Sequence, residues 1–294
     1  MGKIDLGSIG RAGRRRLSPR LAIALVGAAA AVVVLAVALG PRLAGRATAA
    51  GSAAVDAGAR ATTTVATWSY EGRTHDVTLQ DVLDYTGSEG SYASADGTSY
   101  NVPSAETTLA YVRTEALAQA ADDEGIEVTD DDVDSYVTDS MGFDTVDAAA
   151  EEYGMDADAL RAQVRRGLKV QRLQDAKVDS SSLDAAAVPD PPTAPDDGDV
   201  STASTDYRDY VLNVVGDAYD ASTNTWADPE GTYALALSQY DLSGDTATYE
   251  AAEAAYAAAL SSSQEAYSTV DGAWTDYVNG VLSKVTVTLS GAEQ

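Results

Sequence analysis

Few side chains in this sequence are of the kinds that catalyse reactions. The chain has no cysteine, which excludes thiol catalysis, disulfides and thiolate metal sites, and His75 is its single histidine. General acid–base catalysis by one imidazole requires a nucleophile or an orienting partner, and nothing in the sequence suggests either beside His75. We therefore expect His75 to be an exposed turn residue and the protein not to be an enzyme.

Two acidic clusters invite comparison with calcium sites. The opening positions of an EF-hand loop are matched by Asp220, Ser222 and Asn224. Thr225 stands where this loop needs glycine, however, and Gly231 stands where it needs a bidentate glutamate. The second cluster is typical of a helix N-terminus, where the helix dipole stabilises negative charge, and consists of Asp130, Asp131, Asp132 and Asp134. We expect no metal and no cofactor.

Adaptable apolar side chains form the remaining candidate site. Methionine suits a surface that accepts unrelated segments, because its flexible thioether fits irregular shapes. The candidate peptide-binding residues are Tyr85, Tyr136, Met141, Phe143, Tyr153 and Met155. A small helical module also needs such residues for its own core. From the sequence alone, both interpretations stay open.

Helical patterns surround these candidates. The first helix is predicted after Pro103, with Ser104 as N-cap and Gly125 as the stop signal. Its apolar face, at spacings of three and four, is Leu109, Val112, Ala116 and Ala120. The second helix is predicted to be capped by Thr129, with an apolar face of Val133, Tyr136, Val137 and Met141.

Two further helices follow, one over residues 143 to 153 and one capped by Asp156. The last of them carries a row of cations, Arg161, Arg165, Arg166, Lys169 and Arg172. We expect these cations to lie near the helix C-terminus, where the dipole favours positive charge.

The order of these motifs resembles a known family. The motifs are Gly125-Ile126 with Val128-Thr129-Asp130, Phe143 with Thr145-Val146-Asp147, Gly154-Met155-Asp156, and Leu160-Arg161 with Val164-Arg165. In this order they resemble the N-terminal peptide-binding domain of the SurA and PrsA foldases, over roughly residues 63 to 178. The resemblance implies a mostly α fold that binds unfolded or secreted polypeptides.

The end of the chain also resembles that family. A long helix is predicted from about Thr246 to Leu282, with an apolar side of Tyr249, Tyr256, Leu260, Tyr267, Val270, Trp274, Tyr277, Val278 and Val281. Beyond it, Val285, Val287 and Leu289 alternate with threonines, which indicates a strand. The resemblance implies a small β pairing in which this strand closes against the one around Val65 to Trp68.

The parvulin isomerase domain usual in this family is not recognisable. Its histidine-led strands and glycine-rich loops have no counterpart between Asp179 and Ser243. A diverged isomerase between Val200 and Ser243 would have fewer than fifty residues, so prolyl-isomerase activity is not expected.

The N-terminal segment predicts a membrane protein. Leu21 to Gly40 has no charge and is long enough to cross a hydrocarbon layer of about 30 Å as a transmembrane helix. Six cations precede it, which places the N-terminus in the cytoplasm and the C-terminal domain outside the cell. Ala47-Thr48-Ala49 leaves open a cleaved signal sequence, but the length of the apolar run favours a retained anchor.

The charge distribution excludes nucleic acid as a partner. The net charge of the chain is −27, and residues 1 to 46 carry +7, so the remaining residues carry −34. Such a surface repels phosphates and anionic lipids. The predicted domains are a basic cytoplasmic tail (1–20), a transmembrane helix (21–42), a tether (43–62), the SurA-like domain (63–178), a Pro/Asp/Ser-rich linker (179–204) and a C-terminal helical segment with the closing strand (205–294).

Together these observations favour a membrane-anchored extracytoplasmic chaperone or holdase. The alternative is a non-enzymatic envelope scaffold or surface interaction protein with one fixed partner. A holdase suppresses the aggregation of several unrelated clients, whereas a scaffold recognises one.

Overall fold

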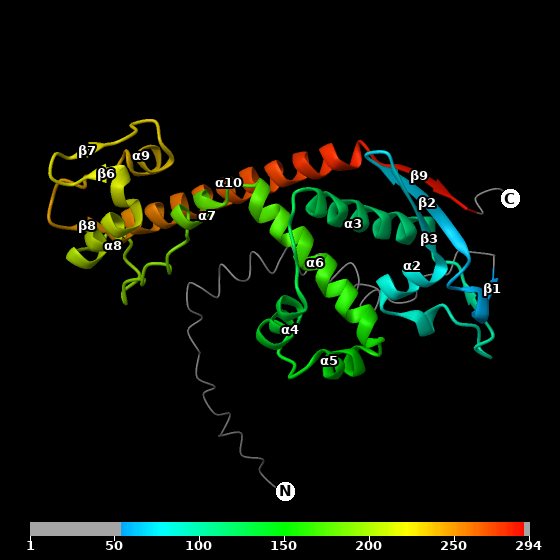
Figure 1. The fold of residues 1–294 in the computed structure, drawn as a ribbon. Helices are drawn as coiled ribbons and strands as arrows, with labels where there is room; N and C mark the ends of the chain where they lie inside the picture. Colours follow the sequence, from blue (N-terminus) through cyan, green and yellow to red (C-terminus); the bar gives the residue numbers. More distant parts are fainter. Residues whose placement is uncertain (1–53, 291–294) are drawn as a thin grey trace, which may run out of the picture. The chain divides into compact units, whose positions relative to one another are not determined.

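A computed structural model describes residues 54 to 290, apart from the side chains of residues 184 and 185, and is mostly helical with small antiparallel sheets (Figure 1). These residues form two compact units, one of residues 54–173 and 284–290, the other of residues 174–283. The expected transmembrane helix and basic tail lie outside the described residues. Within residues 54 to 290, every helix is too short or too polar to cross a membrane.

A three-stranded sheet belongs to the first unit. It has the order β3-β2-β9, formed by β2 (Thr64–Tyr70), β3 (Arg73–Thr78) and β9 (Thr286–Leu289). Both pairings are antiparallel, and β9 places Val287 opposite Trp68. The β pairing that closes the chain is therefore confirmed.

The start of the described chain is ordered, in contrast to the tether expected over residues 43–62. β1 (Ala54–Asp56) pairs with β4 (Ser99–Asn101), and the 3-10 turn η2 (Ala57–Ala59) follows. Arg60 then bonds the carbonyl of Ala57 and the side-chain oxygen of Gln80. This segment of small residues forms a strand because its hydrogen-bond partners lie in β4, more than forty residues further along the chain.

Helices α2 (Leu79–Thr86) and α3 (Ala105–Asp123) continue the first unit. Ser104 caps α3 as predicted, through a 3.2 Å bond from the Thr107 N–H. Val112, Ala116 and Ala120 are buried, whereas Leu109 is 44% exposed, so its assignment to the apolar face is wrong. Thr108 and Tyr111 occupy the buried side of that turn instead. The η3 turn (Glu89–Ser91) lies in the loop between α2 and α3.

Three helices complete the first unit: α4 (Asp130–Asp139), α5 (Val146–Tyr153) and α6 (Ala157–Lys177). Their first turns are capped by Thr129, Thr145 and Asp156, which accept hydrogen bonds from backbone N–H groups two or three residues further on. The helices share a buried cluster of Val133, Val137, Val146, Ala149, Ala150, Leu160 and Val164.

The second unit begins within α6, after Leu173, and not at the proline-rich segment. It contains α7 (Ser181–Ala185), α8 (Thr205–Val215), α9 (Thr232–Leu237) and α10 (Tyr249–Leu282). Two-residue strands form two pairs, β5 (Ala203–Ser204) with β8 (Ala247–Thr248) and β6 (Tyr219–Asp220) with β7 (Thr225–Trp226), and η4 (Gly216–Ala218) precedes β6.

The proline-rich segment between residues 179 and 204 is held by this second unit, in contrast to the linker that we expected. The hydroxyl of Tyr207 donates to the carbonyl of Thr193 at 3.0 Å, and that of Tyr210 donates to the carbonyl of Asp190 at 2.9 Å. Backbone N–H groups of α10 also donate to this segment, from Tyr249 and Glu250.

The long helix α10 matches the predicted span, and of the predicted apolar side Val278 and Val281 are buried, whereas Leu260 and Tyr267 are not. Its buried residues are mainly small: Ala251, Ala252, Ala255, Ala258, Ala259, Ser263, Val278 and Val281. Leu260 and Tyr267 are each 44% exposed. Alanine lets helices approach closely, and α8 and α9 contact α10 along this alanine-rich face.

Candidate functional site

Five of the six candidate peptide-binding residues gather around one hydrophobic cluster. Tyr136, Met141, Phe143, Tyr153 and Met155 are partly buried against the shared core of α4, α5 and α6. Tyr85 does not join them: it is 4% exposed and makes an edge-to-face contact with Tyr111 of α3, at 5.6 Å between ring centroids. The first five residues therefore have both a packed side and an accessible side, whereas Tyr85 belongs to the core.

The turn after α4 positions the aromatic members of this set. Gly142 has a φ of +77°, which lets the chain reverse, and the N–H of Phe143 then donates to the carbonyl of Val137 at 3.2 Å. The ring of Phe143 meets that of Tyr153 edge to face, with 5.5 Å between centroids. Burial, and secondarily the nearby Tyr153, raise the pKa of Tyr136. These rings form a partly apolar surface beside α5.

Met155 lies between α5 and α6 and contacts the end of α2. Gly154 ends α5 with a φ of +65°, and the N–H of Met155 donates to the carbonyl of Ala150 at 2.9 Å. Its sulfur lies against Gly87 at the end of α2, because a Cβ placed on Gly87 would come within 3.0 Å of Met155 Sδ. Met155 also lines a pocket of about 570 Å³ between α2 and the start of α6.

The walls of this pocket, which we call the Met155 pocket, are mostly acidic. Its ionisable residues are Arg60, Asp81, Asp84, Glu89, Asp156, Asp158 and Arg166. Arg60 already pairs with Glu89 at 3.4 Å, and Arg166 pairs with Glu115 at 3.2 Å. Burial raises the pKa of Asp84, and neighbouring carboxylates add to the shift. The pocket therefore favours ligands with positive charge beside apolar groups.

The cations of α6 bind acidic residues of two other helices. Arg161 pairs with Asp134 at 2.8 Å, Arg165 pairs with Asp130, and Arg172 pairs with Asp132 at 2.5 Å, all on α4. Arg166 and Lys169 pair with Glu115 and Asp122 of α3. Their expected interaction with the helix C-terminus is wrong, because they lie along most of α6 and only Lys177 occupies its last turn.

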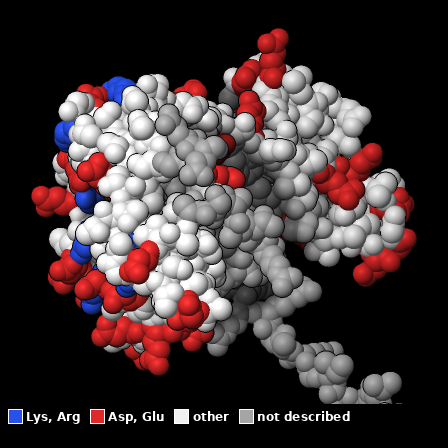
Figure 2. All heavy atoms as spheres, turned by 90° about the vertical axis from the view of Figure 1, so that its right-hand side faces the viewer, with Lys and Arg blue, Asp and Glu red and all other residues white. Residues whose placement is uncertain are grey.

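The cations of these pairs lie within a surface that is otherwise strongly acidic. Figure 2 shows far more acidic than basic side chains on the face in view.

The aspartates near the start of α4 have a structural role. Asp132 accepts a hydrogen bond from the Thr129 N–H at 2.8 Å, and its bonds to Arg172 and Thr129 lower its pKa. In the part of the chain that the structure describes, no group of three or more His, Asp or Glu side chains could hold a metal ion.

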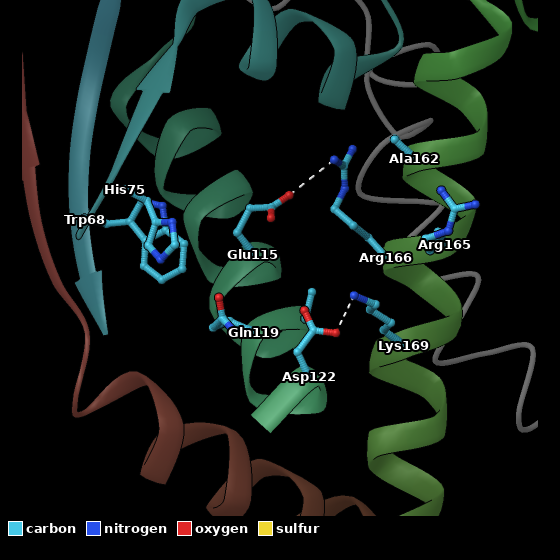
Figure 3. A pocket seen from close by; sticks show the side chains of 10 residues that line it. Trp68, His75, Glu115, Gln119, Asp122, Ala162, Arg165, Arg166 and Lys169 are labelled. Atoms are coloured by element: carbon cyan, nitrogen blue, oxygen red, sulfur yellow. Dashed lines mark hydrogen bonds and ion pairs between the residues drawn. The ribbon is translucent and has the colours of Figure 1, made fainter. Parts of the chain in front are cut away.

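A second cavity, of about 230 Å³, was not foreseen from the sequence. It is lined by Trp68 and His75 of the sheet, by Glu115, Ala118, Gln119 and Asp122 of α3, and by Ala162, Arg165, Arg166 and Lys169 of α6. Figure 3 shows Glu115 and Arg166 reaching toward each other from α3 and α6, while Asp122 meets Lys169. We call this space the charged cavity.

His75 is not the exposed turn residue that we expected. It lies on β3 opposite Trp68, and the two rings stack at 4.5 Å with an angle of 20° (Figure 3). The Nε2 atom of His75 is buried without a hydrogen-bond partner. No local sequence signal identifies this site, because its residues come from strands and helices far apart in the chain.

The EF-hand-like turn has a structural explanation. Asp220 Oδ1 accepts from the N–H and the hydroxyl of Ser222, at 2.8 and 2.7 Å. These bonds, with others from Thr223, lower the pKa of Asp220 to about 2. The carboxylate therefore stabilises the turn between β6 and β7.

Comparison with known proteins gave no match to a family model, a curated protein or a solved structure.

Proposed function

We propose that the protein is a membrane-anchored extracytoplasmic chaperone or holdase that binds unfolded or secreted polypeptides through the surface around α4, α5 and the Met155 pocket. The observation that carries the proposal is the position of Met155, whose flexible thioether lines an open pocket and packs against the same hydrophobic cluster as four other partly buried aromatic and methionine side chains. The helix order from α3 to α6, with closure by β9, supports the SurA- and PrsA-like assignment.

Binding in this proposal uses burial of apolar client side chains. Each 100 Å² of apolar surface removed from water contributes about 2.5 kcal/mol before the cost of ordering the client. The acidic walls add a preference for clients with Lys or Arg near the apolar anchor, and salt weakens that part of the affinity. The sequence contains no phosphate-binding glycine loop, so the proposal needs no nucleotide cycle.

Met155→Ser in the full-length chain tests this assignment. We expect the variant to bind an apolar, lysine-containing peptide about 5- to 150-fold more weakly, because one anchor of roughly 1 to 3 kcal/mol is lost. Fluorescence anisotropy of the labelled peptide measures the affinity. Leu109→Ser is the matched control, since Leu109 is an exposed apolar residue of the same unit that lines neither the Met155 pocket nor the charged cavity.

Stability and client range decide between the possible outcomes. Unchanged thermal stability with weaker binding supports the proposal, whereas equal peptide affinity in Met155→Ser and the unsubstituted chain contradicts it. Suppression of aggregation of several unrelated denatured proteins indicates a holdase. Binding of one partner, without that suppression, indicates the envelope scaffold.

A further inference from the structure

The charged cavity holds three buried polar atoms that lack hydrogen bonds. They are His75 Nε2, Glu115 Oε1 and Arg166 Nε, and all three residues line the same space. Glu115 Oε1 and Arg166 Nη1 form an ion pair of 3.2 Å, but this contact does not have the geometry of a hydrogen bond, and Arg166 Nε takes no part in it. Buried polar groups are normally satisfied, so the group points to a ligand or ordered water.

The charges on the walls define what such a ligand must carry. Arg165, Arg166 and Lys169 face Glu115 and Asp122, so the lining includes three cations and two carboxylates. Arg165 is engaged by Asp130 and Lys169 by Asp122, which leaves Arg166 as the cation whose Nε lacks an acceptor. Arg166 Nη1 also pairs with Glu115, so each of the three cations already has a carboxylate partner, and the ligand must offer an acceptor oxygen to the remaining Arg166 Nε–H.

The orphaned atoms also require a donor. An ionised carboxylate oxygen such as Glu115 Oε1 only accepts hydrogen bonds. Arg166 Nε only donates. The stacked rings of Trp68 and His75 form the opposite wall and hold the imidazole in a fixed orientation (Figure 3).

We propose that the charged cavity binds an α-carboxylate whose α-carbon also carries an N–H group, supplied either by a free amino acid or by the last residue of a polypeptide. Arg166 Nε donates to the carboxylate, Glu115 Oε1 accepts from the N–H, and His75 Nε2 bonds the second carboxylate oxygen as a donor. The volume of about 230 Å³ accommodates one small residue. This inference does not rest on the proposed function, because Met155 does not line the charged cavity.

His75 provides the readout, because it is the single histidine of the chain and gives one set of imidazole signals. The full-length chain, labelled at histidine and kept in mild detergent, is titrated with N-acetylglycine, glycine, acetate and N-acetylglycinamide while its NMR spectrum is recorded. N-acetylglycine represents a polypeptide C-terminus and glycine a free amino acid, so the tighter of the two identifies the source. Acetate lacks the N–H and N-acetylglycinamide lacks the carboxylate, and both are expected to bind at least tenfold more weakly.

Arg166→Lys tests the assigned contact, because lysine keeps the charge opposite Glu115 but has no Nε–H fork. We expect about a tenfold weaker affinity for the tighter probe, while Arg113→Lys, an exposed substitution on α3, leaves it unchanged. If thermal unfolding shows that Arg166→Lys is not folded, Glu115→Leu, which removes the acceptor oxygen, takes its place with the same expected loss. The inference is overturned if neither carboxylate probe shifts the His75 signals, which leaves ordered water, or if N-acetylglycinamide binds as tightly as N-acetylglycine.

Discussion

At the scale of single residues, the contact between Gly87 and Met155 can be tested directly by substitution. Gly87 has a φ of +59° and lies against the Met155 sulfur, whereas Gly125 has a φ of +73° with nothing within 4 Å of a Cβ added there. Both positions favour glycine, but only one is also crowded.

Gly87→Ala should lower the free energy of unfolding by about 2 kcal/mol and Gly125→Ala by about 1 kcal/mol, since alanine resists positive φ at both positions and crowds Met155 at one. Urea denaturation measures the difference. Adding Met155→Ser to Gly87→Ala should remove the extra loss, because serine is short. Equal losses at the two glycines would mean that Met155 does not pack on Gly87.

The N-caps at Ser104, Thr129 and Asp156 could be predicted because capping depends on residues three positions apart. The partners of His75 and Arg166 could not be predicted, because they come from other strands and helices. The same holds for the candidate peptide-binding residues. Their residue types suggest an apolar surface, but the placement of Tyr85 in the core depends on its packing against Tyr111, which the sequence does not show.

At the scale of secondary-structure elements, β9 completes a sheet that begins near the other end of the described chain. The N–H of Ser290 donates to the carbonyl of Val65 at 2.9 Å, next to the four residue pairs of the β2–β9 ladder. Without β9, one edge of β2 would lose its partner.

Deleting residues 284 to 294 should lower the free energy of unfolding of the first unit by several kcal/mol, at about 0.5 to 1.5 kcal/mol per hydrogen bond together with lost apolar burial. Deleting only residues 291 to 294 is the control, because it keeps β9. Denaturant titration compares the two truncations. The same midpoint in both would show that β9 contributes nothing to stability.

Patterns in sequence predicted the bounds of α10 better than its buried face. Aromatic residues at helical spacing suggested the packed side, but the neighbouring helices α8 and α9 approach the alanines instead. Similarly, the composition of residues 179 to 204 predicted a linker, whereas the hydroxyls of Tyr207 and Tyr210 hold that segment by its carbonyls. Both outcomes depend on which neighbours are available, and composition does not encode them.

At the scale of the whole molecule, acidic side chains with opposite pKa shifts control the response to pH. Burial raises the pKa of Asp84, Glu115 and Asp175. Hydrogen bonds lower the pKa of another set, Asp96, Asp123, Asp132, Asp179, Asp199, Asp220 and Asp241, with Asp96 and Asp220 each falling to about 2.

The melting temperature should therefore rise as the pH falls from 7 toward about 4.5, and drop at lower pH. Carboxyls with a raised pKa bind protons more tightly in the folded state, so acidification first stabilises it and relieves repulsion among the acidic side chains. Carboxyls with a lowered pKa stabilise the fold above their ordinary value of 3.8, and this stabilisation is lost as the pH falls through their folded values. Calorimetry across this range measures the profile. A melting temperature that falls steadily from pH 7 would contradict the raised pKa values of Asp84, Glu115 and Asp175.

The position of β9 also governs when the first unit can finish folding during synthesis. More than two hundred residues separate Tyr70 at the end of β2 from Thr286 at the start of β9. At about 5 to 20 residues per second, a ribosome needs on the order of 10 to 40 s to make that interval. All residues of the second unit emerge before β9 does, so β2 keeps an open edge throughout that time. The nascent chain therefore passes through a stage in which β2 is paired with β3 alone, and its open edge can pair with another chain.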